Sequence, residues 1–506
     1  MGIVVRQSIK GTIMNYIGVA VGFITTFFVM TKYLTQEEIG LTRVMADAAI
    51  LLSGLAALGT NTSAMRYYPY FKDKESRDHG FFGWTIIVPA VGFLIFTILF
   101  LVFKDFVINK FSEESPLFVD YMYLIIPMGF FMMYMTVFET NANLLMRIVV
   151  PKFVREVGIR FLTLADYILY ITGVISLDWM VIGLCLTYLI GTLLNIIYLL
   201  SLSKISFKIE PGHVSKWLRK DFLFYTLFLT VAAVVGNIIP SLNTFFITAQ
   251  MGLAVTGIYT IASYMANLVE MPYRSVSAIS RPIISQAMKD NDIRKASEMC
   301  KNVSLHQLVA GAFVFFIIWI NIDLFFEILP NGDKFVAGKW VFFILGLARL
   351  INSSLNIGVT VLSYSKYYYL QLIFTAILTI SAILLNNKLI PIWGMTGAAW
   401  SSVISYLVYY LLLLSMIIWK TKISLFSWKE IVVVAIISIL FIINWLSMKY
   451  ISANFVEMMG GGIVAEMVEA VLRTGILVVL GMAAIYYLKI SKQINDIVDK
   501  ILKQRK

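Results

Sequence analysis

Long apolar stretches recur along the whole chain, and they constrain its fold more than any other feature. A helix needs about 20 mostly apolar residues to cross a bilayer, and by this measure we predict about 14 spans. Only 14% of the residues are charged and 59% are hydrophobic, whereas soluble domains carry about 25% charged residues. We therefore predict an all-α polytopic membrane protein. The approximate centres of the spans are Ala20, Leu52, Phe93, Gly129, Ile168, Ile190, Val235, Met265, Phe315, Gly346, Thr379, Ser405, Ile437 and Val478.

The basic residues predict how the chain crosses the membrane. If the N-terminus lies inside, the inner segments hold 31 Lys and Arg residues and the outer segments hold seven. Cytoplasmic loops carry the excess of basic residues in membrane proteins, so both termini are predicted to be cytoplasmic. The net charge of +12 then belongs to these loops and does not indicate a nucleic-acid partner. The outer residues are Lys32, Lys104, Lys110, Lys334, Lys339, Lys388 and Lys449, and Arg43, Arg349 and Arg473 remain inside spans.

Two parts of the chain share a pattern at the junction of their first two spans. Phe27-Phe28-Val29 precedes Gly40-Leu41, and Phe245-Phe246-Ile247 precedes Gly257-Ile258. The second helix of each part ends with an arginine near a proline, namely Arg66 with Pro69 and Arg281 with Pro282. Transporters are commonly built from such repeats. We predict two six-helix lobes plus two C-terminal helices, with a break at Pro240 and a turn at Gly460–Gly462. The boundaries are 1–203 for the N-lobe, 204–420 for a basic linker and the C-lobe, 421–488 for the two added helices and 489–506 for a cytoplasmic amphipathic tail.

Several of these motifs resemble the signature of polysaccharide-biosynthesis membrane proteins, the Wzx-type flippases of the MOP superfamily, which are related to MATE exporters and MurJ-type flippases. The resemblance covers roughly residues 1–420, and its specificity comes from the arrangement of the motifs across the spans. The motifs are Leu34–Leu41, Leu58-Gly59, Arg66-Tyr67, Gly257–Tyr259 and Pro282–Ser285.

The resemblance implies a MOP/MATE-like fold and a transporter that is not an enzyme and uses no cofactor. It implies flipping of undecaprenyl-pyrophosphate-linked oligosaccharide from the cytoplasmic to the outer leaflet of a bacterial inner membrane, for O-antigen or capsule-type glycans. The implied partners are this lipid-linked glycan and membrane lipids, with a glycan polymerase or ligase as a candidate partner.

The chemistry of such a substrate requires a hydrated path for its charged headgroup, because an unpaired charge in hydrocarbon is very costly. Arginine holds phosphate with a fork of donors, so we expect a cationic central cavity. A rise of about 1.5 Å per residue places Arg43 near the outer mouth and Arg66 about 35 Å away at the inner mouth. Arg349 falls near mid-depth. The candidate cavity residues are Arg43, Arg66, Arg160, Arg274, Arg281 and Arg349.

Each candidate also has a structural interpretation. Arginines at inner ends can extend to the lipid headgroups and set the topology. Arg43 and Asp47 lie four residues apart on one helix face, which is the spacing of an ion pair. Four carboxylates could couple transport to a Na⁺ or H⁺ gradient or could serve as counter-charges, and they are Asp47, Glu139, Asp166 and Glu270. The three histidines are scattered, so no metal site is predicted.

Two other functions compete with the flippase. An ion-coupled, MATE-like exporter of small molecules would share the architecture, but it should favour buried carboxylates over arginines. A membrane polymerase or ligase would be expected to carry a large outer loop with catalytic residues, and every outer loop here is short.

Overall fold

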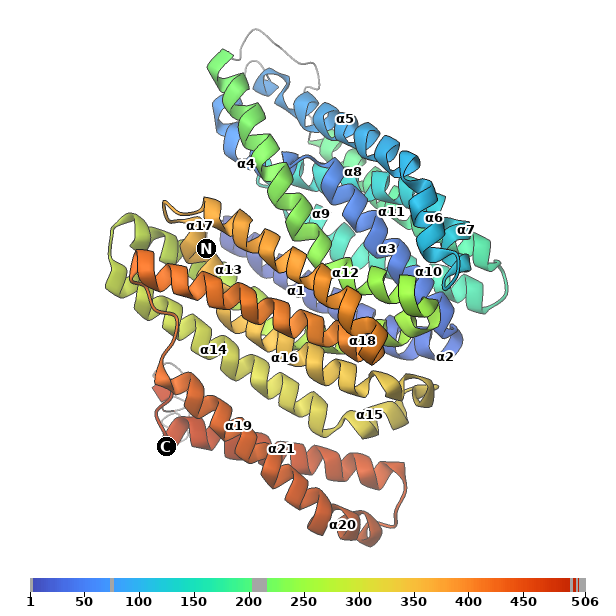
Figure 1. The fold of residues 1–506 in the computed structure, drawn as a ribbon, viewed down its shortest axis with the longest axis vertical. Helices are drawn as coiled ribbons and strands as arrows, with labels where there is room; N and C mark the ends of the chain where they lie inside the picture. The colour runs from blue at the N-terminus through green and yellow to red at the C-terminus, as the bar shows by residue number, and fades with distance from the viewer. Residues whose placement is uncertain (1–2, 73–76, 203–215, 492–494, 497–498, 500–506) are drawn as a thin grey trace. The chain divides into compact units, whose positions relative to one another are not determined.

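The computed structural model describes residues 3–72, 77–202, 216–491, 495–496 and 499, and every element in these ranges is a helix (Figure 1). Side chains are described in 14–72, 78–202, 241–273, 276–277, 280–491, 495–496 and 499. Eleven helices among the described residues are long and apolar enough to cross a membrane. The predicted all-α, multi-pass class is thereby confirmed, while the count of 14 spans stays a prediction.

The chain divides into two compact units, Met1–Thr260 and Ile261–Lys506. In the first unit α3 packs against α5 and α8, and α11 packs against α8 and α10. Its elements are α1 (Ile3–Ile24), η1 (Thr25–Met30), α2 (Thr31–Tyr33), α3 (Gln36–Ala56), α4 (Thr60–Phe71), η2 (Arg77–Gly80), α5 (Phe81–Val102), α6 (Lys104–Phe111), α7 (Pro116–Tyr121), η3 (Met122–Leu124), α8 (Ile125–Leu144), α9 (Val149–Phe153), η4 (Val154–Gly158), α10 (Ile159–Ile171), α11 (Leu177–Ser201) and the first part of α12 (Lys216–Val269).

In the second unit α14 packs against α13, α16 and α19, and α16 packs against α18. Buried apolar side chains of α14, α19 and α21, among them Phe316, Leu440 and Leu477, form one core. After α12 the elements are α13 (Met271–Lys289), α14 (Ile293–Ile320), α15 (Ile322–Ile328), η6 (Gly332–Gly338), α16 (Lys339–Leu355), α17 (Ile357–Ser363), α18 (Tyr369–Thr421), α19 (Trp428–Ser447), η7 (Met448–Ser452), α20 (Ala453–Met458) and α21 (Ile463–Tyr487).

Two of the longest elements each consist of two helices that meet at a glycine. The backbone is non-helical at Gly252 in α12, with φ 87°, and at Gly394 in α18, with φ 60°. Glycine adopts positive φ without steric cost, which explains its use at both positions. The predicted break at Pro240 is wrong, because α12 is helical there and its non-helical residue is Gly252. The predicted turn at Gly460–Gly462 is confirmed, since all three glycines have positive φ.

The polar segment before α3 forms a capping box. The Thr35 Oγ1 accepts a hydrogen bond from the Glu38 N–H at 3.2 Å, and the Thr35 N–H donates to Glu38 Oε2 at 2.8 Å. The Tyr170 hydroxyl of α10 donates to the other Glu38 oxygen at 2.5 Å. A capping box satisfies N–H groups that have no partner inside the helix, so these contacts fix where α3 begins and hold it to α10.

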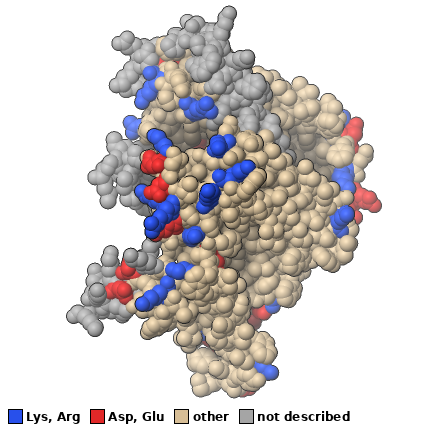
Figure 2. Space-filling model, turned by 60° about the vertical axis from the view of Figure 1, so that its left-hand side comes forward, with Lys and Arg blue, Asp and Glu red and all other residues tan. Residues whose placement is uncertain are grey.

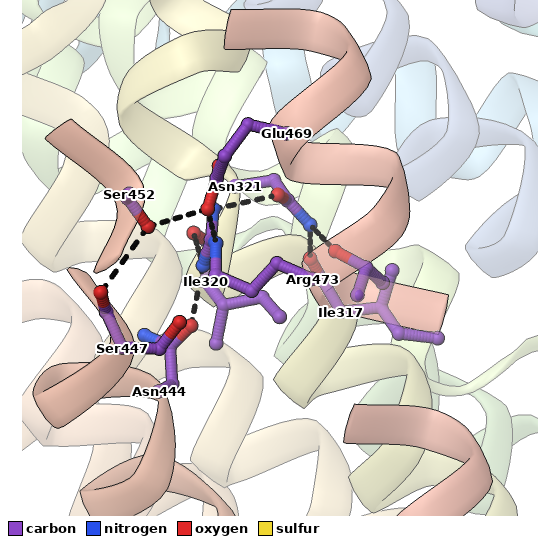
Figure 3. A network of polar contacts seen from close by, with 9 residues as sticks. Ile317, Ile320, Asn321, Asn444, Ser447, Ser452, Glu469 and Arg473 are labelled. Atoms are coloured by element: carbon purple, nitrogen blue, oxygen red, sulfur yellow. Dashed lines mark hydrogen bonds and ion pairs between the residues drawn. The ribbon is translucent and has the colours of Figure 1, made fainter. Parts of the chain in front are cut away.

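A buried arginine holds the last two long helices to α14 (Figure 3). Arg473 of α21 donates to Glu469 Oε1 at 2.9 Å, to the Ile320 carbonyl at 3.3 Å and to Asn444 Oδ1. Its Nη2 also donates to Asn321 Oδ1 at 3.4 Å. Because α14 ends at Ile320, the guanidinium satisfies a carbonyl at the helix C-terminus, where positive charge is favourable.

Apolar side chains cover much of the exposed surface of the long helices. On α5, for example, Leu94, Ile98 and Val102 are 62%, 59% and 67% exposed. Figure 2 shows a face on which groups of Lys and Arg leave a broad uncharged surface between them. Such a surface suits contact with lipid. Most of the predicted tail at 489–506 and the linker residues 204–215 lie outside the described residues.

Candidate functional site

Two helices of the second unit are interrupted where polar side chains gather. Val269 ends α12, Glu270 stands between the helices, and Met271 begins α13 with Pro272 in its first turn. Asn356 stands in the same way between α16 and α17. Proline fits the first turn of a helix because no intrahelical partner is lost there. Both junction residues keep φ and ψ in the α region, at −91° and −8° for Glu270 and at −61° and −21° for Asn356.

Glu270 joins the first interruption to α16. Its Oε2 accepts from Arg349 Nη1 at 3.2 Å, and its Oε1 accepts from Asn352 Nδ2 at 2.5 Å. The side chains of Arg349 and Glu270 are 23% and 17% exposed, so this ion pair is largely shielded from solvent. Arg349, with no carboxylate within one turn of its own helix, is thus neutralised by a carboxylate from another helix.

The network continues from Asn352 to the second interruption. The Tyr410 hydroxyl of α18 donates to Asn352 Oδ1 at 2.7 Å, and Asn356 Nδ2 donates to the same oxygen at 3.4 Å. The Tyr273 hydroxyl donates to Asn356 Oδ1 at 2.6 Å and accepts from Arg281 Nη2 at 3.3 Å. A continuous chain of polar contacts therefore runs from Arg281 on α13 to Glu270 and Arg349.

The candidates of the first unit lie in separate groups. Arg43 Nε and Asp47 Oδ2 form an ion pair at 2.9 Å on α3, as their spacing indicated. Arg160 Nη1 donates to the Gly18 carbonyl at 2.6 Å. Glu139 Oε2 forms an ion pair with Arg155 Nη1 at 2.9 Å. Arg155 and Arg160 both lie near Glu156, at 3.2 and 3.9 Å, so ion pairs link Glu139 indirectly to Arg160.

Two further candidates of the first unit lie on α4 and α10. Arg66 is exposed on α4, with its guanidinium 5.4 Å from the centre of the Tyr67 ring. Asp166 is 8% exposed on α10, and its Oδ2 has no hydrogen-bond partner among the described residues. Its carboxylate packs directly against Gly183 of α11, where a Cβ would overlap it. In the second unit, the side chain of the candidate Arg274 lies outside the described residues.

The structure therefore brings Arg281, Arg349 and Glu270 into one network. Sequence reasoning missed the uncharged members of this network, which are Tyr273, Asn352, Asn356 and Tyr410. One signal was available, because the spacing from Arg349 to Asn352 and Asn356 places all three on one face of a helix. Within the ranges that the structure describes, no group of three or more His, Cys, Asp or Glu residues could hold a metal ion.

The fold is that of the MOP superfamily of membrane transporters. The structure is similar to that of the lipid II flippase MurJ in an inward closed conformation, with a TM-score of 0.71 and 14% identity over 94% of this chain and 98% of that one. An inward-facing multidrug resistance MATE transporter gives a TM-score of 0.58 and 15% identity over 81% of this chain and 99% of that one. A MOP superfamily transporter from Pyrococcus furiosus gives a TM-score of 0.54 and 16% identity over 83% of this chain and 96% of that one.

The sequence itself defines the family. The model of the polysaccharide biosynthesis protein family matches residues 4–288, which is more than half of the chain. The chain belongs to this family, and its many helices that could cross a membrane are those of a multi-pass membrane protein. No curated protein sequence matches it.

Proposed function

We propose that the chain moves an undecaprenyl-pyrophosphate-linked oligosaccharide from the cytoplasmic to the outer leaflet of a bacterial inner membrane, with both termini in the cytoplasm. The family supports a role in polysaccharide synthesis, and the name of the first solved structure, a lipid II flippase, supports a lipid-linked substrate. The observation that carries the proposal is the largely shielded ion pair of Arg349 on α16 with Glu270 at the junction of α12 and α13.

The headgroup pyrophosphate competes with Glu270 for Arg349. Arginine is always charged and offers five donors in a planar fork that matches phosphate oxygens. Arg349 Nη1 donates to Glu270 Oε2 at 3.2 Å, while Asn352 holds the other Glu270 oxygen at 2.5 Å. In this proposal Arg349 turns to the anionic ligand while Asn352 keeps Glu270 in place.

This exchange also supplies a place for a coupling ion. Once Arg349 binds phosphate, Glu270 is left as a shielded carboxylate without its counter-charge, which is unfavourable. A proton or Na⁺ at Glu270 restores neutrality. Arg349 contacts Glu270 directly, and Tyr273, Arg281 and Tyr410 belong to the same network. Tyr406 of α18 also lies near Glu270. We expect Glu270→Gln to keep headgroup binding and to lose the dependence of transport on a pH or Na⁺ gradient.

Surface glycan tests the function in cells. In a host that lacks this chain and accumulates its lipid-linked oligosaccharide, wild type should restore surface glycan. Arg349→Ala and Arg43→Ala should not restore it, although both proteins insert. Lys339→Ala is the matched control, because it removes a cation of the same unit from a pair with the exposed Asp323. Normal surface glycan with Arg349→Ala would contradict the site, and export of small cations in place of glycan would favour the MATE-like exporter.

A further inference from the structure

Two lysines that are distant in sequence meet at one tyrosine ring in the second unit. Lys366 lies in the turn between α17 and α18, and its Nζ is 5.3 Å from the centre of the Tyr367 ring. Lys420 lies in the last turn of α18, and its Nζ is 5.9 Å from the centre of the same ring. An aromatic face attracts an ammonium group at this range, so the ring of Tyr367 holds both positive charges in one place.

Close packing of α17 against the last part of α18 brings these two segments together. A Cβ on Gly358 of α17 would lie 2.7 Å from the Leu413 side chain and 3.2 Å from the Ile417 side chain. Leu413 and Ile417 belong to α18, and both are 0% exposed. Small residues let helices in a membrane approach closely. The turn that follows α17 is therefore fixed beside the end of α18 by a buried apolar contact.

The sequence around the two lysines supplies no acidic residue to neutralise them. From position 334 to position 429 there is no Asp or Glu, and the basic residues in this stretch are Lys334, Lys339, Arg349, Lys366, Lys388, Lys420, Lys422 and Lys429. Within the ranges that the structure describes, neither Lys366 nor Lys420 forms an ion pair. Like charges at this range repel each other, so an anion placed between the two ammonium groups is favourable.

Exposed aromatic side chains surround the two lysines. They are Tyr364, Tyr368, Tyr369 and Trp419, with exposed fractions of 51%, 54%, 49% and 70%. The Nζ of Lys420 also lies 3.4 Å from the centre of the Trp419 ring. Tyrosine and tryptophan concentrate at the level of the lipid headgroups. The predicted topology places both lysines on the cytoplasmic side, where the membrane surface is negative and attracts basic residues.

We propose that Lys366 and Lys420 form a binding site for the phosphate of one anionic phospholipid of the cytoplasmic leaflet. Lysine binds phosphate as a point charge, and two lysines on one ring offer a charge of +2 to one headgroup. The acyl chains of this lipid lie along the apolar surface of α18, where Ile418 is 52% exposed. The bound lipid holds the turn after α17 to the end of α18, whatever substrate the chain carries.

Native mass spectrometry of the full chain in a neutral detergent tests the site. Wild type should retain one phosphatidylglycerol in preference to phosphatidylcholine. Lys366→Gln and Lys420→Gln should each weaken this binding by about fivefold, the contribution of one basic residue at an anionic membrane surface. Lys422→Gln is the matched control, because Lys422 is exposed two positions beyond Lys420 and has no ring contact among the described residues. Equal weakening by Lys422→Gln and Lys420→Gln would overturn the site, since diffuse surface charge predicts that result.

Thermal unfolding tests the role of the ring and the identity of the anion. Phosphatidylglycerol should raise the unfolding midpoint of wild type, because a ligand that binds only the folded state stabilises it. Tyr367→Phe keeps an aromatic face and should keep this increase, whereas Tyr367→Ala should lose it. An equal increase in both variants would contradict the role of the ring. Displacement of the lipid by an equal concentration of inorganic phosphate or undecaprenyl phosphate would assign the site to a different anion and overturn the proposal.

Discussion

Replacing Arg473 by leucine should destabilise the protein by about 3–5 kcal/mol, because it leaves the buried carboxylate of Glu469 without its partner. Four hydrogen bonds from Arg473 are lost at the same time. At roughly 0.6 kcal/mol for each hydrogen bond inside a membrane, these account for about 2 kcal/mol. The rest comes from the unpaired charge, since the Arg473 and Glu469 side chains are only 6% and 11% exposed.

The double variant Arg473→Leu/Glu469→Leu separates the two contributions. Apolar replacement of both partners of a buried pair removes the unpaired charge and is often neutral or stabilising. The double variant should therefore recover the part of the loss that comes from the Glu469 charge, but not the part that comes from the hydrogen bonds to Ile320, Asn321 and Asn444. Reversible unfolding of the purified protein in mixed micelles gives the free energies of a double-mutant cycle. Lys339→Leu is the control, because it breaks a pair with the 78%-exposed Asp323 and should cost less than about 1 kcal/mol. Additive losses from the two leucines would refute this account of the network.

Three further substitutions test the backbone and packing arguments by thermal unfolding. Gly394→Ala should cost about 1–3 kcal/mol, because φ 60° with ψ −141° is a region that only glycine adopts readily; an unchanged midpoint would contradict this. Ser427→Ala removes the capping box of α19 and should cost about 1 kcal/mol, with faster hydrogen exchange in the first turn of α19. Gly183→Ala should cost about 1–3 kcal/mol by overpacking against Asp166. Adding Asp166→Ala to the same chain should restore this stability, and a double variant as unstable as Gly183→Ala would contradict the overlap with Asp166.

The fold class could be predicted because the bilayer leaves few alternatives. A backbone that crosses hydrocarbon must satisfy its own hydrogen bonds, so long apolar runs such as that around Phe93 can only be helices. The exact ends of these helices depend on local chemistry that composition does not reveal. The interruption of α12 falls at Gly252 and not at Pro240, since a membrane helix tolerates proline where its neighbours satisfy the freed carbonyl.

The site could be predicted only in its charged members. Arg281, Arg349 and Glu270 were candidates because ionisable groups in spans are costly, but their connection depends on tertiary contacts. It runs through the uncharged Asn352 and Asn356, which are not distinctive in an apolar sequence. The pair of Arg43 with Asp47 was accessible from sequence, because both partners lie on one helix at a spacing of four. Arg473 has a role that becomes visible only once α14 is seen to end at Ile320.

Transport of the headgroup in proteoliposomes tests the central claim most directly. The purified protein is reconstituted with fluorescent undecaprenyl-pyrophosphate-linked oligosaccharide, and a membrane-impermeant quencher reports which leaflet holds the headgroup. Wild type and Lys339→Ala should move the headgroup across the bilayer, and Arg349→Ala should lose at least about tenfold in rate, as expected when a charge-assisted contact to phosphate is removed. Transport by Arg349→Ala at the wild-type rate, or no transport by wild type, would contradict the account.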